Sequence, residues 1–256
     1  MPIATVAGFN LTPVKSTALH HPDAIDLRRE GAVGDRRFLF ARPDGTRLRG
    51  ISKAPLIPIV ATWLTAEEHL TLRLADSTVV EGSALPSGER VDVKLFDRTI
   101  SARPIHPSFA EAIAAAVDET LGLLRVGEPE YAGGVHRVSI VSLASVEDVG
   151  VRGADPNLDP RRFRALIELD GPDAYDEDAW QGQRIRVGEA VIRLRQRMPR
   201  CVMTTLDPDT GEKNFDALKV LAGYRKVGTE VVLGVHGDVE QPGRIERGDP
   251  VELLGW

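Results

Sequence analysis

A succession of short β-rich segments in the first hundred residues constrains the fold of this chain most strongly. Gly, Pro, Asp and Ser punctuate the sequence between these segments, and Asp44-Gly45 supplies the positive φ that a tight hairpin turn needs. The segments with a β-rich or alternating sequence cover residues 3–9, 35–41, 58–64, 70–75 and 91–96. This pattern predicts an all-β, barrel-like domain over residues 1–105.

The residue composition changes near residue 105, from β-rich segments to an alanine-rich stretch. Pro107 and Ser108 precede an alanine-rich stretch, and this combination predicts a helix over 108–121 that ends at Gly122. A domain boundary is therefore predicted near residue 105, between the first all-β part and the rest of the chain.

The second part of the chain mixes strands with a few helices. The clearest helix is predicted over 214–226, where the apolar residues gather on one side. Strand candidates cover 136–142, 162–169, 183–188, 190–197 and 229–236. We therefore expect a mainly β fold with a few helices (α+β), in which an amino-terminal β-barrel domain (1–105) precedes a second β-barrel domain (106–256).

The bulk composition favours a globular protein that acts on a small molecule. The chain has 256 residues, of which 42% are hydrophobic, and this is enough to bury a core. Its formal net charge of −6 argues against nucleic acid as a partner, because binding to a phosphate backbone requires an excess of Lys and Arg. The sequence lacks a signal-peptide pattern and any apolar run near the ~20 residues that span a bilayer, so we expect a cytoplasmic protein without membrane attachment.

Cys201 is the only cysteine in the chain. It cannot form an intramolecular disulfide, and an iron–sulfur cluster held by four cysteines of this chain is excluded. A soft thiolate suits late transition metals and sulfur chemistry, and neighbouring cations such as Arg197 and Arg200 favour the thiolate form. The residues alone leave a second interpretation open, in which Cys201 is a small buried hydrophobic residue.

Three arginines alternate with apolar residues in the predicted strand before Cys201. Because side chains on a strand repeat every two residues, Arg193, Arg195 and Arg197 should share one face. Guanidinium groups bind phosphate and carboxylate oxygens, so this face could line an anion site beside the thiol. The alternative is that the three arginines cover the solvent face of a barrel strand.

Four further polar residues are candidates for anion binding. Lys15 and Ser16 follow the first predicted strand, where an ammonium and a hydroxyl could hold a phosphate, although a loop lysine is often only solvated. Arg36 and Arg164 fall near or within predicted strands, where an inward-facing arginine requires an anion. The acidic stretch 207–211 is interpreted as a turn and not as a calcium loop.

Several motifs follow one another in a characteristic order along both halves of the chain. They are PVKS (13–16), GDRRF (34–38), RFRALI (162–167), DEDAWQGQRIRVGEAVIRL (176–194), RCVMTTLDPDTG (200–211), LKVLAGYR (218–225) and PGRIERGDPVELL (242–254). Together they resemble MOSC-domain proteins that have an amino-terminal β-barrel domain, the group that includes the mitochondrial amidoxime-reducing component. The most specific element is Arg-Cys followed by Thr-Thr and Asp-Pro-Asp-Thr-Gly.

The resemblance implies that the chain binds the molybdenum cofactor (molybdenum-molybdopterin) and that Cys201 is both the metal ligand and the catalytic residue. The cofactor contacts that it implies are Lys15, Ser16 and Arg36 for the terminal phosphate, Arg164 for the pterin, Arg200 before the ligand, and Ser142. A pyridoxal phosphate-binding label also accompanies this family, without support from residues of this chain.

The chain departs from the family pattern at two places. Where the amidoxime reductases continue as Arg-Pro-Asn, this sequence has Arg164-Ala165-Leu166, so that an apolar side chain replaces a polar cofactor contact. The stretch RLRGISK (47–53) replaces the usual Thr-Ala-Arg-Gln and is expected to change the wall of the pocket.

The activity implied by the resemblance is the reduction of N-hydroxylated substrates, such as amidoximes and hydroxylamines, or of N-oxides. The electrons must come from a separate ferredoxin, flavodoxin or cytochrome b5-like protein, because this chain has neither cluster cysteines nor a glycine-rich nucleotide loop. One alternative is a protein that uses Cys201 to carry sulfur, or one that uses Cys201 to bind the molybdenum cofactor without turnover. Another is a fold that has lost its cofactor and only packs Cys201.

Overall fold

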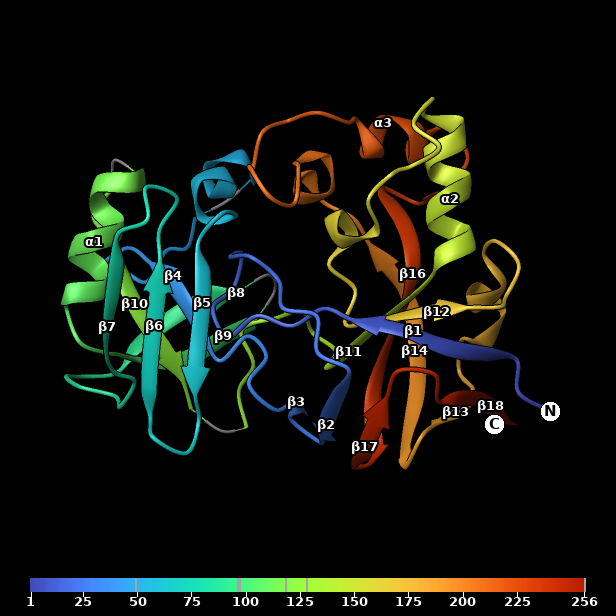
Figure 1. Ribbon diagram of the computed structural model, residues 1–256, viewed down its shortest axis with the longest axis horizontal. Coiled ribbons are helices and arrows are strands. Elements are labelled where there is room, and N and C mark those ends of the chain that lie inside the picture. Colours follow the sequence, from blue (N-terminus) through green and yellow to red (C-terminus); the bar gives the residue numbers. More distant parts are fainter. Residues whose placement is uncertain (49, 96–97, 118, 128, 256) are drawn as a thin grey trace.

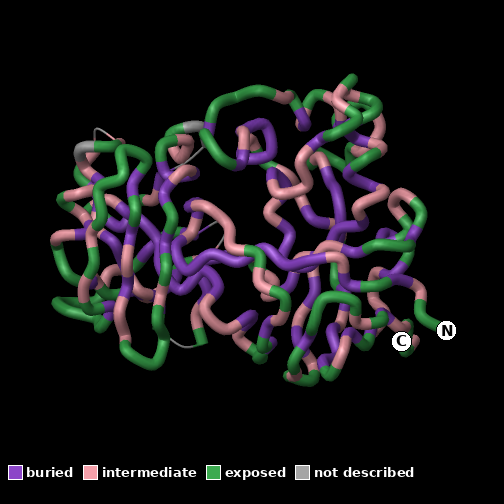
Figure 2. Tube along the Cα trace, in the orientation of Figure 1, coloured by how far each residue is buried: buried purple, intermediate pink, exposed green. Residues whose placement is uncertain are grey.

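The computed structural model describes residues 1–48, 50–95, 98–117, 119–127 and 129–255 (Figure 1). Over these residues the chain is mainly β, with three short α-helices, which confirms the predicted fold class. A group of sheets built largely from the first half of the chain lies beside a barrel built largely from the second half (Figure 1). Buried positions follow the strands of both parts, whereas the outer loops are exposed (Figure 2).

Seven strands close into a barrel, in which each strand pairs with the next and the pairing of the last with the first completes the ring. The ring order is β11 (Val138–Ser142), β12 (Ile167–Asp170), β1 (Ala4–Phe9), β18 (Pro250–Gly255), β13 (Arg184–Val187), β14 (Ala190–Pro199) and β16 (Glu230–Gln241). Only β11 and β12 run parallel among these pairs of described strands. One strand from the start of the chain therefore completes a ring of strands from its second half.

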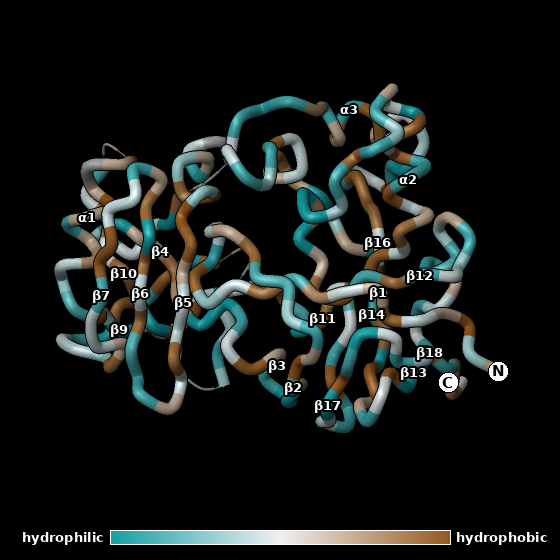
Figure 3. The backbone as a smooth tube through the Cα atoms, in the orientation of Figure 1, coloured by the Kyte–Doolittle hydropathy of each residue, from teal (hydrophilic) through white to brown (hydrophobic). Residues whose placement is uncertain are grey.

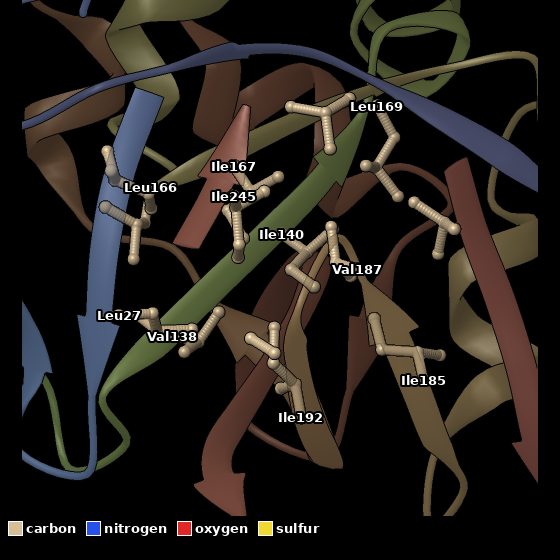
Figure 4. Packing of buried hydrophobic residues seen from close by; sticks show 14 of the residues in the cluster. Leu27, Val138, Ile140, Leu166, Ile167, Leu169, Ile185, Val187, Ile192 and Ile245 are labelled. Carbon is tan, nitrogen blue, oxygen red and sulfur yellow. The ribbon is translucent and has the colours of Figure 1, made fainter. Parts of the chain in front are cut away.

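Apolar side chains at alternating strand positions fill the barrel (Figure 4). Ile167 and Leu169 of β12 and Ile185 and Val187 of β13 are fully buried, and the two residues of each pair are two positions apart in the sequence. Leu166 joins the same core with only 1% of its surface exposed, and its backbone N–H donates to the hydroxyl of Ser139 at 2.9 Å. Leu166 is thus a packing residue of the barrel.

Two antiparallel sheets form the other side of the molecule. The first has the order β4 (Phe38–Ala41), β10 (Gly122–Val126), β9 (Arg98–Pro104), β8 (Val91–Leu95), and the second is the meander β5 (Val60–Leu64), β6 (His69–Arg73), β7 (Val79–Ser83). Helix α1 (Ser108–Val117) contacts β7 and β10 and buries Phe109 and Ile113. Hydrophobic residues concentrate along these strands (Figure 3), so this part has apolar cores of its own.

Smaller elements surround the two parts. A three-stranded sheet has the order β17 (Gly243–Glu246), β2 (Ala24–Arg28), β3 (Gly31–Ala32), and β15 (Lys226–Val227) forms a hairpin with β16. Helices α2 (Leu143–Arg152) and α3 (Ala217–Ala222) contact each other and cover a separate apolar cluster. The sheet of β2, β3 and β17 joins segments from the two ends of the chain.

Two of the predicted strands begin later than the sequence indicates. The segment 162–169 opens with the 3-10 helix η2 (Pro160–Phe163), and Arg164 ends this helix in a left-handed conformation with φ 52°, so β12 starts only at Ile167. Likewise Arg36 has φ 46° and β4 starts at Phe38. Both arginines lie in turns before strands, because their left-handed backbone is far from the extended conformation that a side-chain-bearing residue adopts in a regular strand.

The domain boundary near residue 105 stays a prediction. Strands from before and after residue 105 pair with each other in two sheets. In one sheet β10 pairs with β4 and β9, and in the other β1 pairs with β12 and β18.

Among the described residues, no helix is long and apolar enough to cross a bilayer. The cytoplasmic location also stays a prediction.

Candidate functional site

A pocket of about 430 Å³ lies where the amino-terminal loops meet the end of β14. Its lining consists of Lys15, Ser16, Arg36, Arg47, Lys53, Arg162, Phe163, Arg164, Pro199, Arg200, Cys201, Val202, Met203 and Thr204. Seven of these described residues are Lys or Arg, and none is Asp or Glu. The pocket is therefore strongly cationic and contains one thiol.

Cys201 follows the end of β14 and directly precedes the 3-10 helix η4 (Val202–Thr205). Its side chain is exposed to the pocket, while its carbonyl accepts hydrogen bonds from the backbone N–H and the hydroxyl of Thr204, at 3.1 and 3.0 Å. The backbone is thus fixed while the thiol stays accessible. This position excludes the interpretation of Cys201 as a buried packing residue and contradicts the hypothesis of a fold that only packs it.

Arg200 anchors the segment that carries the thiol. Its backbone N–H donates to the Val231 carbonyl, and its guanidinium donates to the carbonyls of Leu233 and Phe163, all at 2.8 Å. The guanidinium also lies over the Phe163 ring, 5.4 Å from the centroid. One guanidinium nitrogen, Nη2, is buried and has no hydrogen-bond partner in the described part of the chain.

Lys15 and Ser16 lie in the loop that follows β1. The Lys15 backbone N–H donates to the Phe38 carbonyl at 2.8 Å, and its ammonium donates to the Gly133 carbonyl at 3.3 Å. Ser16 is buried and has φ 77°, so the chain turns sharply and directs both residues to the pocket. The structure therefore brings the predicted phosphate-binding pair to the same pocket as Cys201.

Arg36 and Arg164 connect two loops of the pocket. Arg36 Nη1 pairs with the Asp35 carboxylate at 2.5 Å, and its Nη2 donates to the Arg164 carbonyl at 3.1 Å. Arg164 Nη2 donates in turn to the Thr17 carbonyl at 2.6 Å. Burial disfavours a charge on Arg36, but Asp35 outweighs this and raises the pKa of Arg36 above its ordinary value.

The cations of the pocket lack sufficient counter-charge from the protein. Burial lowers the pKa of Lys15 and of Arg164, and in both cases the charge of Arg36 lowers it further. Burial also lowers the pKa of Lys53 and of Arg200, although the Cys201 thiolate opposes this in both. A bound anion would stabilise the charged forms and raise these pKa values, so the electrostatics of this pocket suit an anionic ligand.

Three lining cations were missed by reasoning from the sequence. Arg47 and Lys53 come from the stretch 47–53, which the sequence indicated only as a departure from the family pattern. Arg162 precedes the predicted Arg164 by two residues, and its guanidinium donates to backbone carbonyls of the segment after Cys201. The positive charge of the three side chains was visible in the sequence. That all three line the same pocket depends on tertiary packing, which the sequence does not show.

The arginine stripe on β14 is not part of this pocket. Arg193 pairs with Glu240 at 2.9 Å, Arg195 with Asp238 at 2.8 Å and Arg197 with Asp178 at 3.2 Å. Each guanidinium therefore already has a carboxylate of this chain, which favours the interpretation of this stripe as an outer barrel face over the alternative of an anion site.

Ser142 is the one predicted contact that the structure does not bring to the pocket. It is fully buried at the junction of β11 and α2, where its backbone N–H donates to the Glu177 carboxylate at 3.3 Å. Its hydroxyl lies 3.5 Å from the Pro172 carbonyl.

The 207–211 segment is a turn, as predicted, in which Asp207 accepts hydrogen bonds from the backbone N–H groups of Asp209 and Thr210.

Comparisons with known proteins place this fold and pocket in context. The sequence model of the MOSC domain matches residues 129–252. Mitochondrial amidoxime reducing component 2 of Rattus norvegicus is 31% identical over 286 residues, which cover 97% of this chain and 83% of the relative. The chain therefore belongs to the family of MOSC-domain proteins that includes the amidoxime reducing components.

Two further similarities are more distant. A molybdenum cofactor sulfurase of Oryza sativa subsp. japonica is 32% identical over 80 residues, which cover 30% of this chain and 10% of the relative. Among solved structures, the YUAD protein from Bacillus subtilis superimposes with a TM-score of 0.49 at 14% identity, and the match covers 99% of this chain and 96% of that one.

Proposed function

We propose that this protein binds the molybdenum cofactor in the cationic pocket and that Cys201 is the protein ligand to molybdenum. The observation that carries the proposal is an exposed thiol among seven cations, with no carboxylate on the described lining. The phosphate and the dithiolene of molybdopterin are anionic, and thiolate is a suitable ligand for a soft metal centre. Membership of the MOSC-domain family supports the same cofactor.

The residues of the pocket fit an anionic cofactor. Arg200 Nη2 and Arg162 Nε are buried and lack hydrogen-bond partners in the described part of the chain, so both can donate to a ligand. The volume of about 430 Å³ lies within the range of about 300–1,000 Å³ that is typical of small-molecule sites. A buried donor without an acceptor is costly, and a bound anion would remove that cost.

In this proposal each residue has a separate task. Lys15, Ser16 and Arg36 bind the terminal phosphate, while Arg164 contacts the pterin. Arg200 fixes the backbone that presents Cys201, through the two carbonyl contacts described above. The bound cofactor would supply a two-electron redox centre, and the protein supplies its orientation and charge balance.

We propose that the reaction is the reduction of N-hydroxylated compounds, such as amidoximes and hydroxylamines, or of N-oxides. The substrate takes up two electrons and two protons, the N–O bond breaks, and the oxygen leaves as water. The electrons come from a separate ferredoxin, flavodoxin or cytochrome b5-like protein. Support for this reaction comes from the amidoxime reducing components, which match nearly the whole chain.

The decisive experiment compares the wild type with Cys201→Ala, both produced in a host that makes the molybdenum cofactor. We expect about one molybdenum per wild-type chain and anaerobic reduction of benzamidoxime by a chemical electron donor. Cys201→Ala should lose activity yet unfold at the same urea concentration, because Cys201 is exposed. Wild-type protein without molybdenum, or full activity in Cys201→Ala, would refute the proposal.

A second candidate function is sulfur transfer through Cys201. The exposure of its thiol supports this candidate, as does the similarity to a molybdenum cofactor sulfurase over 80 residues. A cysteine desulfurase would then place a persulfide on Cys201 in protein that holds no molybdenum. Intact-mass measurement should show a gain of one sulfur atom in the wild type and none in Cys201→Ala.

A further inference from the structure

We infer that the pocket selects N-oxygenated substrates that carry a carboxylate, and that Lys53 binds this carboxylate. The inference rests on the proposed reductase function and adds a substrate class to it. It starts from the part of the pocket wall where the sequence departs from the family pattern, the stretch 47–53.

Packing of two 3-10 helices places Lys53 beside the thiol. The helix η1 (Gly50–Leu56) carries Lys53 and contacts η4, which begins directly after Cys201. An apolar cluster holds this contact together and consists of Ala54, Ile57, Met203 and Leu206. The blue helix of 50–56 and the orange loop after β14 lie next to each other in Figure 1. The ammonium therefore belongs to a fixed wall of the pocket and not to a free loop.

The other cations of the pocket already have tasks. Arg36 is paired with Asp35, and the Arg162 guanidinium donates to the carbonyls of Thr204 and Leu206 and to the side chain of Asn214. Lys15, Arg164, Arg200 and the Nε of Arg162 are assigned to the cofactor in the proposal above. These assignments leave Lys53 for the substrate.

Lys53 is well placed to bind a negative group of the substrate. It is half-buried, and no hydrogen bond or ion pair joins its ammonium to the described part of the chain. Burial makes an uncompensated charge costly, so the ammonium is most stable when a ligand brings a negative group. Arg47 lines the same pocket and adds to the positive field around that group.

The rest of the lining defines the shape of the substrate. Phe163, Val202 and Met203 contribute the larger apolar side chains of the lining. An aromatic or aliphatic body would lie against these side chains, with the N–O group directed to the redox centre and the carboxylate to Lys53. A carboxylate accepts charge-assisted hydrogen bonds, and these are about twice as strong as neutral ones.

The test compares 4-carboxybenzamidoxime with benzamidoxime in wild type, Lys53→Gln and Lys94→Gln. Lys94 is the matched control, because it is an exposed lysine on β8 outside the pocket lining. The wild type should prefer the carboxylate substrate about tenfold in kcat/KM, through a lower KM, because a tenfold preference corresponds to about one charge-assisted hydrogen bond. Lys53→Gln should reduce the preference to less than twofold, whereas Lys94→Gln should keep it.

Two further readouts separate this inference from the proposed function. Calorimetric binding of the two amidoximes to the oxidised protein, without an electron donor, should show the same Lys53-dependent preference. Equal affinities in the wild type, an unchanged preference in Lys53→Gln, or loss of molybdenum from Lys53→Gln would each overturn the inference. If the wild type reduces neither amidoxime, the reductase proposal fails, and the binding measurement still decides the role of Lys53.

Discussion

The guanidinium of Arg36 donates a hydrogen bond of 3.1 Å to the carbonyl of Arg164, which is 128 residues further along the chain. Both residues have left-handed backbone conformations and both line the pocket. Asp35 holds the Arg36 side chain, and the hydroxyl of Tyr131 donates to the same carboxylate at 2.7 Å. This buried group of residues fixes the spacing between the loop that carries Lys15 and the turn before β12.

Replacement of Asp35 should destabilise the protein strongly. Asp35→Asn leaves Arg36 buried without a counter-charge, and we expect a loss of about 3 kcal/mol in the free energy of unfolding, measured by urea denaturation. Asp26→Asn is the matched control, because its partner Arg244 lies 3.6 Å away in an exposed pair, and it should cost less than about 1 kcal/mol. Equal losses in the two variants would show that burial does not matter to the Arg36 pair.

Restoring the polar residue of the family pattern at position 166 should damage the protein and not improve it. Leu166 packs in the barrel core, so Leu166→Asn buries an amide among apolar side chains. We expect a loss of about 3 kcal/mol in the free energy of unfolding, and no gain in molybdenum content. Leu85→Asn, at a position with 56% exposure, should change stability by less than about 0.5 kcal/mol. A Leu166→Asn protein with normal stability and more molybdenum would contradict the packing role.

His236 should make the protein sensitive to acid. Its pKa is lowered from 6.5 to about 3, chiefly by burial and in addition by the charges of Arg200 and His136. Between these two pH values the unfolded chain binds a proton that the native protein does not bind. The stabilising contribution is therefore complete above pH 6.5 and falls by about 1.4 kcal/mol per pH unit as the pH decreases towards 3.

Urea denaturation from pH 4.5 to 7.5 measures this contribution. His236→Phe removes the titrating group while keeping a ring of similar size, so its stability should depend less on pH than that of the wild type by about 1 kcal/mol per pH unit below pH 6. A slope that His236→Phe does not reduce would assign the acid sensitivity to other groups.

Gly211 supports the wall that carries Lys53. It has φ 77°, and a Cβ atom there would lie 2.3 Å from the Ala54 carbonyl oxygen. Gly211→Ala should therefore lose about 2 kcal/mol or more of the free energy of unfolding and displace η1. Gly248→Ala has a similar φ of 88° but no atom within 4 Å of the added Cβ, so only backbone strain of about 1 kcal/mol is expected. Thermal unfolding of the two variants isolates the steric contribution.

The strand pattern was predictable from the sequence where the apolar periodicity was regular. The candidate at 190–197 is observed as β14 (Ala190–Pro199), because its apolar residues face the barrel core. The starts of β4 and β12 were not predictable, since nothing in the identity of Arg36 or Arg164 signals a left-handed conformation. Tertiary hydrogen bonds hold these two residues there.

The candidate site was predictable in part for the same reason. Motif resemblance indicated Cys201, Arg200 and Lys15, which do line one pocket. It did not indicate Lys53, whose position depends on the packing of η1 against a helix about 150 residues away in the sequence. Short-range patterns carry no information about such a contact.

The position of β1 in the barrel has a consequence for any attempt to isolate the MOSC domain. The residues that the family model matches, 129–252, do not include β1, which lies between β12 and β18 in the ring. A fragment cut to those limits would lack one strand of the barrel, and the edges of β12 and β18 that pair with β1 would expose unpaired backbone groups. Such open edges recruit strands from other molecules. By covering these edges, β1 thus protects the protein against self-association. A catalytic assay would not detect this role.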